Sequence, residues 1–245
     1  MRGRTLGLIL VFVATCDSRL EAACIESAQL AHSAVSITRY FEEGESVALS
    51  GVIGARGTAW FLSPTKLVTA EHVSTGMKLT AQEWKPIEIR DGKQIRSIAA
   101  RFQRAVGTTE EKLAVLELQT AHPEARQAEI RTAPLAPEDR VVTFAYTEGR
   151  PRVVGGRFVK YGDDERLAGA AMLEMFDGDD RLAIDYGASG APVYDCEGRI
   201  TAVVTTVITQ AFPGLSGRMR VSTPWGTPNV VSVPIGAVRD ALPVR

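Results

Sequence analysis

Short strand-like runs, broken at close intervals by turn residues, constrain this chain more than any other feature of its sequence. The runs are six to nine residues long and are rich in valine, threonine, isoleucine and aromatic residues. They span residues 47–54, 58–64, 66–73, 113–118, 140–146, 152–159, 200–208 and 229–235. With 22 glycines and 12 prolines among 245 residues, chain breakers leave little room for long helices. The pattern predicts an all-β protein of the barrel or sandwich type.

A polar, proline-containing stretch divides these runs into two comparable sets. It covers residues 119–139, and we interpret it as a linker at 121–139. The linker would separate a first unit at 24–120 from a second unit at 140–245. The first unit would open with a short helix or arm at 24–36, where apolar residues recur at near-helical spacing.

The first 23 residues have the layout of a secretory signal peptide. Arg2 and Arg4 precede a short apolar run at 6–15, and two alanines stand directly before Cys24. A run of about ten residues is too short to span a bilayer as a helix, which takes about 20. We therefore predict cleavage after residue 23, with a lipid-anchored form as the alternative. The mature chain would be periplasmic or secreted, with no membrane span.

Removal of such a signal would leave two cysteines, Cys24 and Cys196, from the three in the full sequence. Cysteine pairs in exported proteins are usually oxidised. We therefore expect a Cys24–Cys196 disulfide that ties the mature N-terminus to the second unit. The alternative is two unrelated buried thiols.

Charge and composition argue against several function classes. The 28 basic and 29 acidic residues give a net charge of −1, which lacks the basic footprint of a nucleic-acid-binding protein. The three histidines and two mature cysteines have no metal-ligand spacing. We expect no metal and no other cofactor.

Two short motifs carry the chemistry that the sequence predicts. The first is Gly57-Thr-Ala-Trp-Phe followed by Thr69-Ala-Glu-His72, and the second is the loop Gly-Ala-Ser189-Gly-Ala-Pro at 187–192. A serine hydroxyl becomes a good nucleophile only when a neighbouring base takes its proton. We therefore predict Ser189 as nucleophile and His72 as base. The amides of Gly187 and Ser189 would form an oxyanion hole.

In order and spacing, these motifs resemble those of the chymotrypsin-fold serine peptidases, and in particular the bacterial HtrA-type domains. The segment at 229–242 also resembles the closing strand and short helix of that family. The resemblance implies two packed six-stranded antiparallel β-barrels with short N-terminal and C-terminal helices. The histidine and an acid would come from the first barrel, and the serine from the second.

One residue departs from the family pattern. The family usually has an aspartate at the start of the strand that here begins Lys112-Leu113, so Lys112 stands in the acid's place. The acid orients the imidazole and stabilises its protonated form. We expect Glu111 to take this role. Glu110, Asp91 and a Ser–His dyad without any acid are the alternatives.

By family position, the primary substrate pocket would be lined by Ala183, Thr205 and Val207. None of these residues carries a charge, which favours a small or medium apolar side chain before the cleaved bond; Asp180 and Asp185, close by in the sequence, leave a basic side chain as the alternative. The sequence as a whole predicts an exported serine endopeptidase that acts on proteins or peptides. The alternatives are a pseudopeptidase that binds peptides or proteins, and an esterase-like hydrolase. The sequence leaves the oligomeric state open.

Overall fold

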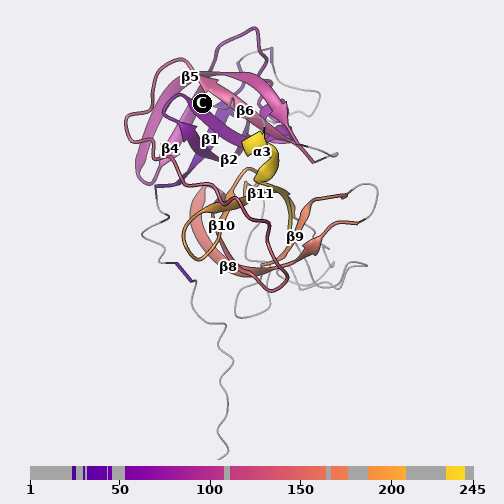
Figure 1. Ribbon diagram of the computed structural model, residues 1–245. Helices are drawn as coiled ribbons and strands as arrows, with labels where there is room; N and C mark the ends of the chain where they lie inside the picture. Colours follow the sequence, from indigo (N-terminus) through magenta and orange to yellow (C-terminus); the bar gives the residue numbers. More distant parts are fainter. Residues whose placement is uncertain are drawn as a thin grey trace, which may run out of the picture.

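The computed structural model describes residues 24–25, 30, 32–42, 44–45, 53–107, 111–163, 167–175, 187–207 and 230–240. Twelve strands within these ranges close into two antiparallel barrels, which lie one above the other in Figure 1. The all-β fold with two six-stranded barrels, predicted from the family resemblance, is confirmed.

The first barrel has the strand order β1-β2-β3-β6-β5-β4. Its strands are β1 (Ala34–Tyr40), β2 (Gly54–Ser63), β3 (Lys66–Ala70), β4 (Lys85–Asp91), β5 (Gln94–Val106) and β6 (Leu113–Leu118). Pairing of β1 with β4 closes the ring. Three residues of β1 lie in the segment at 24–36, where the sequence predicted a helix or arm, because β1 pairs with β2 along its full length. Half of the remaining segment, residues 26–29 and 31, lies outside the described residues.

The second barrel repeats this arrangement, in the order β10-β11-β12-β9-β8-β7. Its strands are β7 (Arg140–Thr147), β8 (Arg150–Tyr161), β9 (Ala171–Glu174), β10 (Pro192–Tyr194), β11 (Ile200–Val207) and β12 (Val230–Pro234). If the strands of each barrel are numbered from one to six, both barrels have the same cyclic order.

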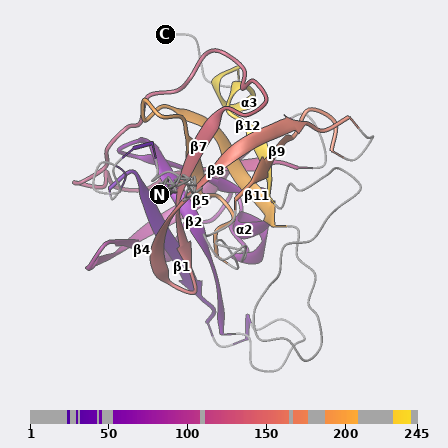
Figure 2. The ribbon, with the colours of Figure 1, turned by 90° about the horizontal axis from the view of Figure 1, so that it is seen from below.

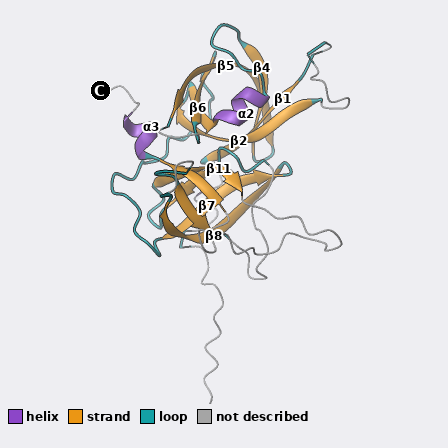
Figure 3. Cartoon of the chain, turned by 90° about the vertical axis from the view of Figure 1, so that its right-hand side faces the viewer, coloured by secondary structure: helices purple, strands orange, loops and turns teal. Residues whose placement is uncertain are grey.

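Two short helices accompany the barrels, α2 (Glu71–Gly76) and α3 (Gly236–Asp240), drawn in purple in Figure 3. Helix α2 follows β3 directly and contacts β2, β3 and β6 of the first barrel (Figure 2). Helix α3 is the predicted C-terminal helix, and its Val238 is buried in the cluster between the barrels. Neither helix is long enough to cross a membrane, and the described residues contain no other candidate.

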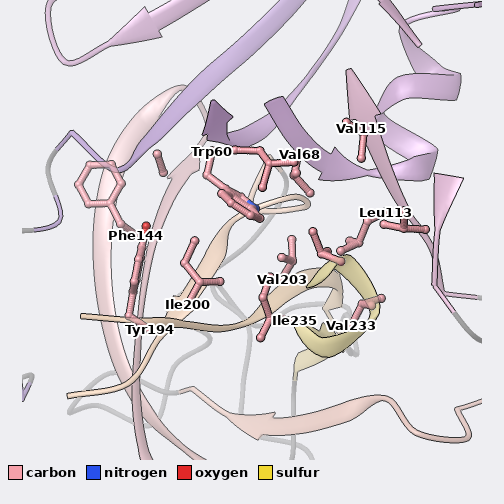
Figure 4. Packing of buried hydrophobic residues seen from close by; sticks show 14 of the residues in the cluster. Trp60, Val68, Leu113, Val115, Phe144, Tyr194, Ile200, Val203, Val233 and Ile235 are labelled. Atoms are coloured by element: carbon pink, nitrogen blue, oxygen red, sulfur yellow. The ribbon is translucent and has the colours of Figure 1, made fainter. Parts of the chain in front are cut away.

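Strand β2 shows why the barrels pack face to face. Because side chains alternate along a strand, Ala59 and Phe61 point into the core of the first barrel, while Trp60 and Leu62 point the other way. Trp60 is fully buried among residues from both barrels. Figure 4 shows this cluster, with labelled members Trp60, Val68, Leu113, Val115, Phe144, Tyr194, Ile200, Val203, Val233 and Ile235. This apolar interface fixes the two motifs relative to each other.

Candidate active site

The second motif forms a tight loop that leads into β10, and hydrogen bonds fix it on β11. The Gly190 amide donates to the Val204 carbonyl at 2.7 Å, and the Val204 amide donates to the Ala191 carbonyl at 2.8 Å. Within the loop, the Ala191 amide donates to the Ala188 carbonyl at 2.8 Å. The loop around Ser189 is therefore held by the second barrel.

Glycine is required at both positions that flank the loop's central residues. Gly187 and Gly190 have φ values of +97° and +90°, which side chains rarely adopt. A Cβ added to Gly190 would lie 2.0 Å from the Thr58 carbonyl oxygen and 2.3 Å from the Thr69 Oγ1. A Cβ on Gly187 would lie 2.6 Å from the Tyr146 carbonyl oxygen. The glycines thus allow the loop to approach both barrels closely.

Ser189 is half-buried, and its hydroxyl donates a hydrogen bond of 3.2 Å to the Thr205 carbonyl. Thr205 lies at an irregularity in the β11–β12 pairing, between Val204 and Thr206. Its own hydroxyl donates to the Val231 carbonyl at 3.2 Å. The Ser189 hydroxyl is therefore directed towards the backbone of β11 at Thr205.

The amides and the carbonyls of Gly187 and Ser189 differ in whether they make hydrogen bonds. Within the described residues, the amides of Gly187 and Ser189 have no acceptor, whereas the carbonyls of both residues accept hydrogen bonds from Thr58. The Thr58 amide donates to the Ser189 carbonyl at 3.0 Å, and the Thr58 hydroxyl donates to the Gly187 carbonyl at 2.6 Å. Two free amides on one loop can bind the oxygen of a tetrahedral intermediate.

His72 is the second residue of α2. The sequence predicted a strand through residue 73, but β3 ends at Ala70, and α2 begins at Glu71. His72 is exposed, while its neighbour Val73 is buried against Gly57. A Cβ on Gly57 would lie 2.5 Å from the Val73 Cγ1 and 3.3 Å from the Ser189 carbonyl oxygen. The base motif and the serine loop therefore meet across Gly57.

The pairing of β3 with β6 brings the backbone next to Glu111 to the start of α2, the helix that carries His72. β3 pairs with β6 so that Ala70 lies opposite Leu113, and the Glu71 amide extends this pairing by donating to the Lys112 carbonyl at 2.9 Å. His72 and Glu111 are each the next residue beyond this hydrogen bond, and the charge of Glu111 acts on the His72 imidazole. The side chain of Lys112 is exposed, and only its backbone takes part. A carboxylate one residue before Lys112 therefore exerts an electrostatic effect on His72, although Lys112 occupies the family's acid position.

Two opposing effects act on the pKa of His72. Partial desolvation by the surrounding protein is the larger effect and lowers this pKa below its ordinary value, although the residue as a whole is exposed. The Glu111 carboxylate acts in the opposite direction and raises the pKa. The net result is an imidazole that is neutral at pH 7, as a general base must be.

The alternative acids lie elsewhere or outside the described residues. Asp91 is buried at the β4–β5 turn, where one of its carboxylate oxygens lies 3.2 Å from the His32 Nδ1. It is not among the groups that shift the pKa of His72. Glu110 lies outside the described residues. Among the carboxylates of the described residues, Glu111 is therefore the one whose charge shifts the pKa of His72.

The predicted substrate pocket is described only in part. The Thr205 side chain is buried, and its carbonyl lies at the Ser189 hydroxyl. The backbone of Val207 pairs with Val230 of β12. Ala183 lies outside the described residues, as does the predicted signal peptide at 1–23. The lining of the pocket stays a prediction.

The predicted disulfide between Cys24 and Cys196 is present, with the two Cα atoms 5.0 Å apart. Cys196 lies in the turn between β10 and β11, close to the Arg140 carbonyl. The bond therefore ties the chain before β1 to the barrel that carries Ser189.

Thr58 and Thr69 belong to the first motif, but the sequence predicted no role for either. The Thr69 hydroxyl donates to the Thr58 carbonyl at 2.7 Å, and the Thr58 hydroxyl accepts from the Tyr146 amide at 3.0 Å. Both side chains are fully buried. The sequence signal was a threonine in each part of the first motif. A threonine hydroxyl that becomes buried needs a hydrogen-bond partner.

Comparison with known families yields one match, to the trypsin-like peptidase domain over residues 57–203. The matched segment covers more than half of the chain and contains both motifs. No curated protein is similar enough to count as a match.

Solved structures of proteases share the fold. The Rv3671c protease from M. tuberculosis, in its active form, is 17% identical with a TM-score of 0.57, over 87% of this chain and 80% of that one. The HtrA-type protease AlgW with a tripeptide is 16% identical with a TM-score of 0.58, over 85% and 58%. Deg5 is 17% identical with a TM-score of 0.57, over 87% and 88%. At these identities the likeness concerns the fold.

Proposed function

We propose that this chain, which belongs to the trypsin-like peptidase domain family, is an exported serine endopeptidase that cleaves proteins or peptides. One observation carries the proposal: the loop of Ser189, with two amides free of acceptors among the described residues, meets the His72 helix across Gly57. The charge of Glu111 acts on the imidazole of His72.

The reaction would begin with rotation of the Ser189 side chain from the Thr205 carbonyl towards His72. The imidazole takes the hydroxyl proton as the serine oxygen attacks the scissile carbonyl. The amides of Gly187 and Ser189 stabilise the negative charge on the former carbonyl oxygen. His72 then gives the proton to the leaving amine, and water hydrolyses the acyl-enzyme by the same steps.

Glu111 would fill the role that the family assigns to aspartate. Its negative charge favours the protonated imidazole that forms during each half of the reaction. The same charge raises the pKa of His72, which is the sign expected for such a partner. The longer glutamate side chain allows the acid to act from the residue before Lys112.

Export is supported by the Cys24–Cys196 disulfide, because such bonds persist in oxidising compartments. Expression of the full chain in a bacterium tests this part of the proposal. We expect the protein in the periplasm, with Cys24 as its first residue and with no free thiol. Retention of the full-length chain in the cytoplasm would contradict it.

Hydrolysis by the exported protein tests the endopeptidase. We expect internal cleavage of an unfolded protein substrate, observed by mass spectrometry, and loss of all cleavage in Ser189→Ala and His72→Ala. Cleavage of small acyl esters without any cleavage of peptide bonds would indicate the esterase-like hydrolase. Peptide binding without hydrolysis, unchanged in Ser189→Ala, would indicate the pseudopeptidase.

A further inference from the structure

Thr58 makes hydrogen bonds with every polar atom that it has, and its partners lie in both barrels. Its amide donates to the Ser189 carbonyl, and its hydroxyl donates to the Gly187 carbonyl. The same hydroxyl accepts from the Tyr146 amide in β7, and the Thr58 carbonyl accepts from the Thr69 hydroxyl. Since Thr58 is fully buried in β2, water does not compete for these bonds.

Two of these hydrogen bonds go to Gly187 and Ser189, the residues whose amides are the proposed oxyanion donors. Thr58 holds the carbonyls of Gly187 and Ser189 on the side of the first barrel, and the amides of these two residues stay free of acceptors within the described chain. The angle between the amide and the carbonyl of one residue is set by its φ and ψ, so bonds that hold the carbonyls limit where the neighbouring amides can point. Thr58 thus occupies the carbonyls and leaves the amides to a ligand.

The orientation of the Ser189 amide follows from planarity. This amide shares a rigid peptide plane with the Ala188 carbonyl, which accepts from the Ala191 amide at 2.8 Å. The planes on either side contain the carbonyls that Thr58 binds. Three consecutive carbonyls are therefore held, and the plane between the two Thr58 bonds has little freedom to rotate.

The hydroxyl of Thr58 is the part of this arrangement that depends on the side chain. A hydroxyl can donate one hydrogen bond and accept two, so it can join the Tyr146 amide to the Gly187 carbonyl. Valine has the same shape but offers neither function. Without the hydroxyl, the Tyr146 amide would lose its acceptor, and the Gly187 carbonyl its donor, at a buried position.

We propose that Thr58 is a positioning residue for the oxyanion hole: by holding the Gly187 and Ser189 carbonyls, it fixes the peptide planes on either side of the one that carries the Ser189 amide, and so directs this amide at the substrate carbonyl. Thr58 acts through the loop and touches no reacting atom. The inference rests on the proposed peptidase function and adds a role for the first barrel beyond its supply of His72 and Glu111.

Thr58→Val and Thr58→Ser, measured against the wild-type protein, test this role. Loss of one oxyanion donor in a serine peptidase lowers kcat by about 10²–10³-fold, and we expect a fall of about 10²-fold for Thr58→Val. KM should change little, because substrate binding in the ground state does not use the oxyanion hole. Thr58→Ser keeps the hydroxyl and should restore most of the lost kcat.

The affinity for a peptide aldehyde distinguishes a role in the oxyanion hole from a merely structural role of Thr58. The aldehyde adds to the serine and forms a tetrahedral oxyanion, so its affinity should fall in Thr58→Val in parallel with kcat, while KM stays near the wild-type value. Thr201→Val is the matched control. Its buried hydroxyl also donates to a carbonyl, that of Val193 at 3.1 Å, but it lies away from the Ser189 loop. This control should keep the wild-type kcat and aldehyde affinity.

The possible results separate the two proposals. Equal kcat and equal aldehyde affinity in Thr58→Val and wild type would overturn the role of Thr58 while the peptidase stands. A rise in KM with unchanged kcat would overturn it as well, because the hydroxyl would then serve binding or stability. A folded wild-type protein that neither hydrolyses peptides nor binds the aldehyde would overturn the peptidase, and the role of Thr58 with it.

Discussion

The serine half and the histidine half of the candidate site are held in place by different means. The loop of Ser189 has two glycines with positive φ and three consecutive carbonyls that accept hydrogen bonds from fixed partners. His72 lies exposed on a six-residue helix whose first turn has no side-chain cap. The serine half depends on its local sequence, and the histidine half depends on the register of β3 and β6.

This difference explains how the family's acid position can hold a lysine. On the serine half, an added methyl group would meet backbone atoms within 2.0 Å, so that the motif tolerates little change. On the histidine half, a carboxylate has only to reach an exposed imidazole. Glu111 can do so from the residue before Lys112, since the Lys112 carbonyl accepts the Glu71 amide and so holds this stretch of backbone at the start of α2.

Gly190→Ala should have the largest effect, because it breaks the serine half at its closest contact. The new Cβ would overlap the Thr58 carbonyl and the Thr69 hydroxyl, at a φ of +90° that alanine rarely adopts. We expect a loss of stability of about 2–4 kcal/mol from the clash and the backbone strain. Displacement of the nucleophile should lower kcat/KM by at least about 10³-fold.

Denaturant unfolding and peptide hydrolysis measure these two effects. Gly92→Ala is a matched control, since Gly92 also has a positive φ but no atom within 4 Å of an added Cβ. A Gly190→Ala variant with nearly wild-type stability and activity would contradict the account of the serine loop.

Glu111→Gln should have the next largest effect, on the histidine half. A buried aspartate in the serine-protease triad contributes about 10⁴-fold to kcat, and we expect about 10²-fold for the partly exposed Glu111. The carboxylate raises the pKa of His72, so its removal should lower that pKa further. The base is active when neutral, and the acid limb of kcat/KM should therefore move to lower pH.

A pH profile of kcat/KM for the wild type and Glu111→Gln checks the sign of this shift. An acid limb that stays in place, or that moves to higher pH, would show that Glu111 does not act on His72. A Ser–His dyad without an acid would give that unchanged limb together with an unchanged kcat.

Removal of the disulfide should lower stability more than activity. The bond closes a loop between residues separated by 172 positions, and Cys24→Ser with Cys196→Ser should reduce the free energy of unfolding by about 2–5 kcal/mol. The bond touches neither half of the site, so the folded variant should keep most of its kcat. Denaturant unfolding, with activity measured well below the midpoint, distinguishes the two quantities. A large loss of kcat in the folded variant would contradict this separation.

Lys112→Ala should have the smallest effect. Its exposed side chain lies outside both halves, and only its backbone carbonyl binds the Glu71 amide. An exposed charge contributes about 0–1 kcal/mol, so kcat/KM should stay within about fivefold of the wild-type value. Steady-state kinetics on one peptide substrate suffices. A much larger loss would mean that the lysine itself serves the site.

The sequence predicted the fold through its motifs more than through its strand runs. The strands β4 and β5 were not singled out, because alternating charged and polar residues on their exposed faces weaken the apolar pattern. The start of β1 was interpreted as part of a helix or arm, and pairing with β2 and β4 overrides that local spacing. Barrel closure is a tertiary property that single runs do not show.

The candidate site divides in the same way. His72 and Ser189 stand in short motifs, and Val73 of the His72 helix and the backbone of the Ser189 loop meet at Gly57. From the sequence, Glu111 could be named only as one of several candidate carboxylates. Its place in the fold depends on the pairing of β3 with β6, in which Ala70 lies opposite Leu113, and the sequence alone does not reveal this register. Thr58 was missed because a buried hydroxyl shows its role only through its partners.

The rate at which a fluorophosphonate probe labels the exported protein tests the central claim most directly, since the probe reacts only with an activated serine. The account predicts labelling at Ser189 that is lost in Ser189→Ala and His72→Ala, is slowed in Glu111→Gln, and is unchanged in Lys112→Ala. Absence of labelling in the folded wild-type protein would contradict it, and so would labelling that persists in His72→Ala.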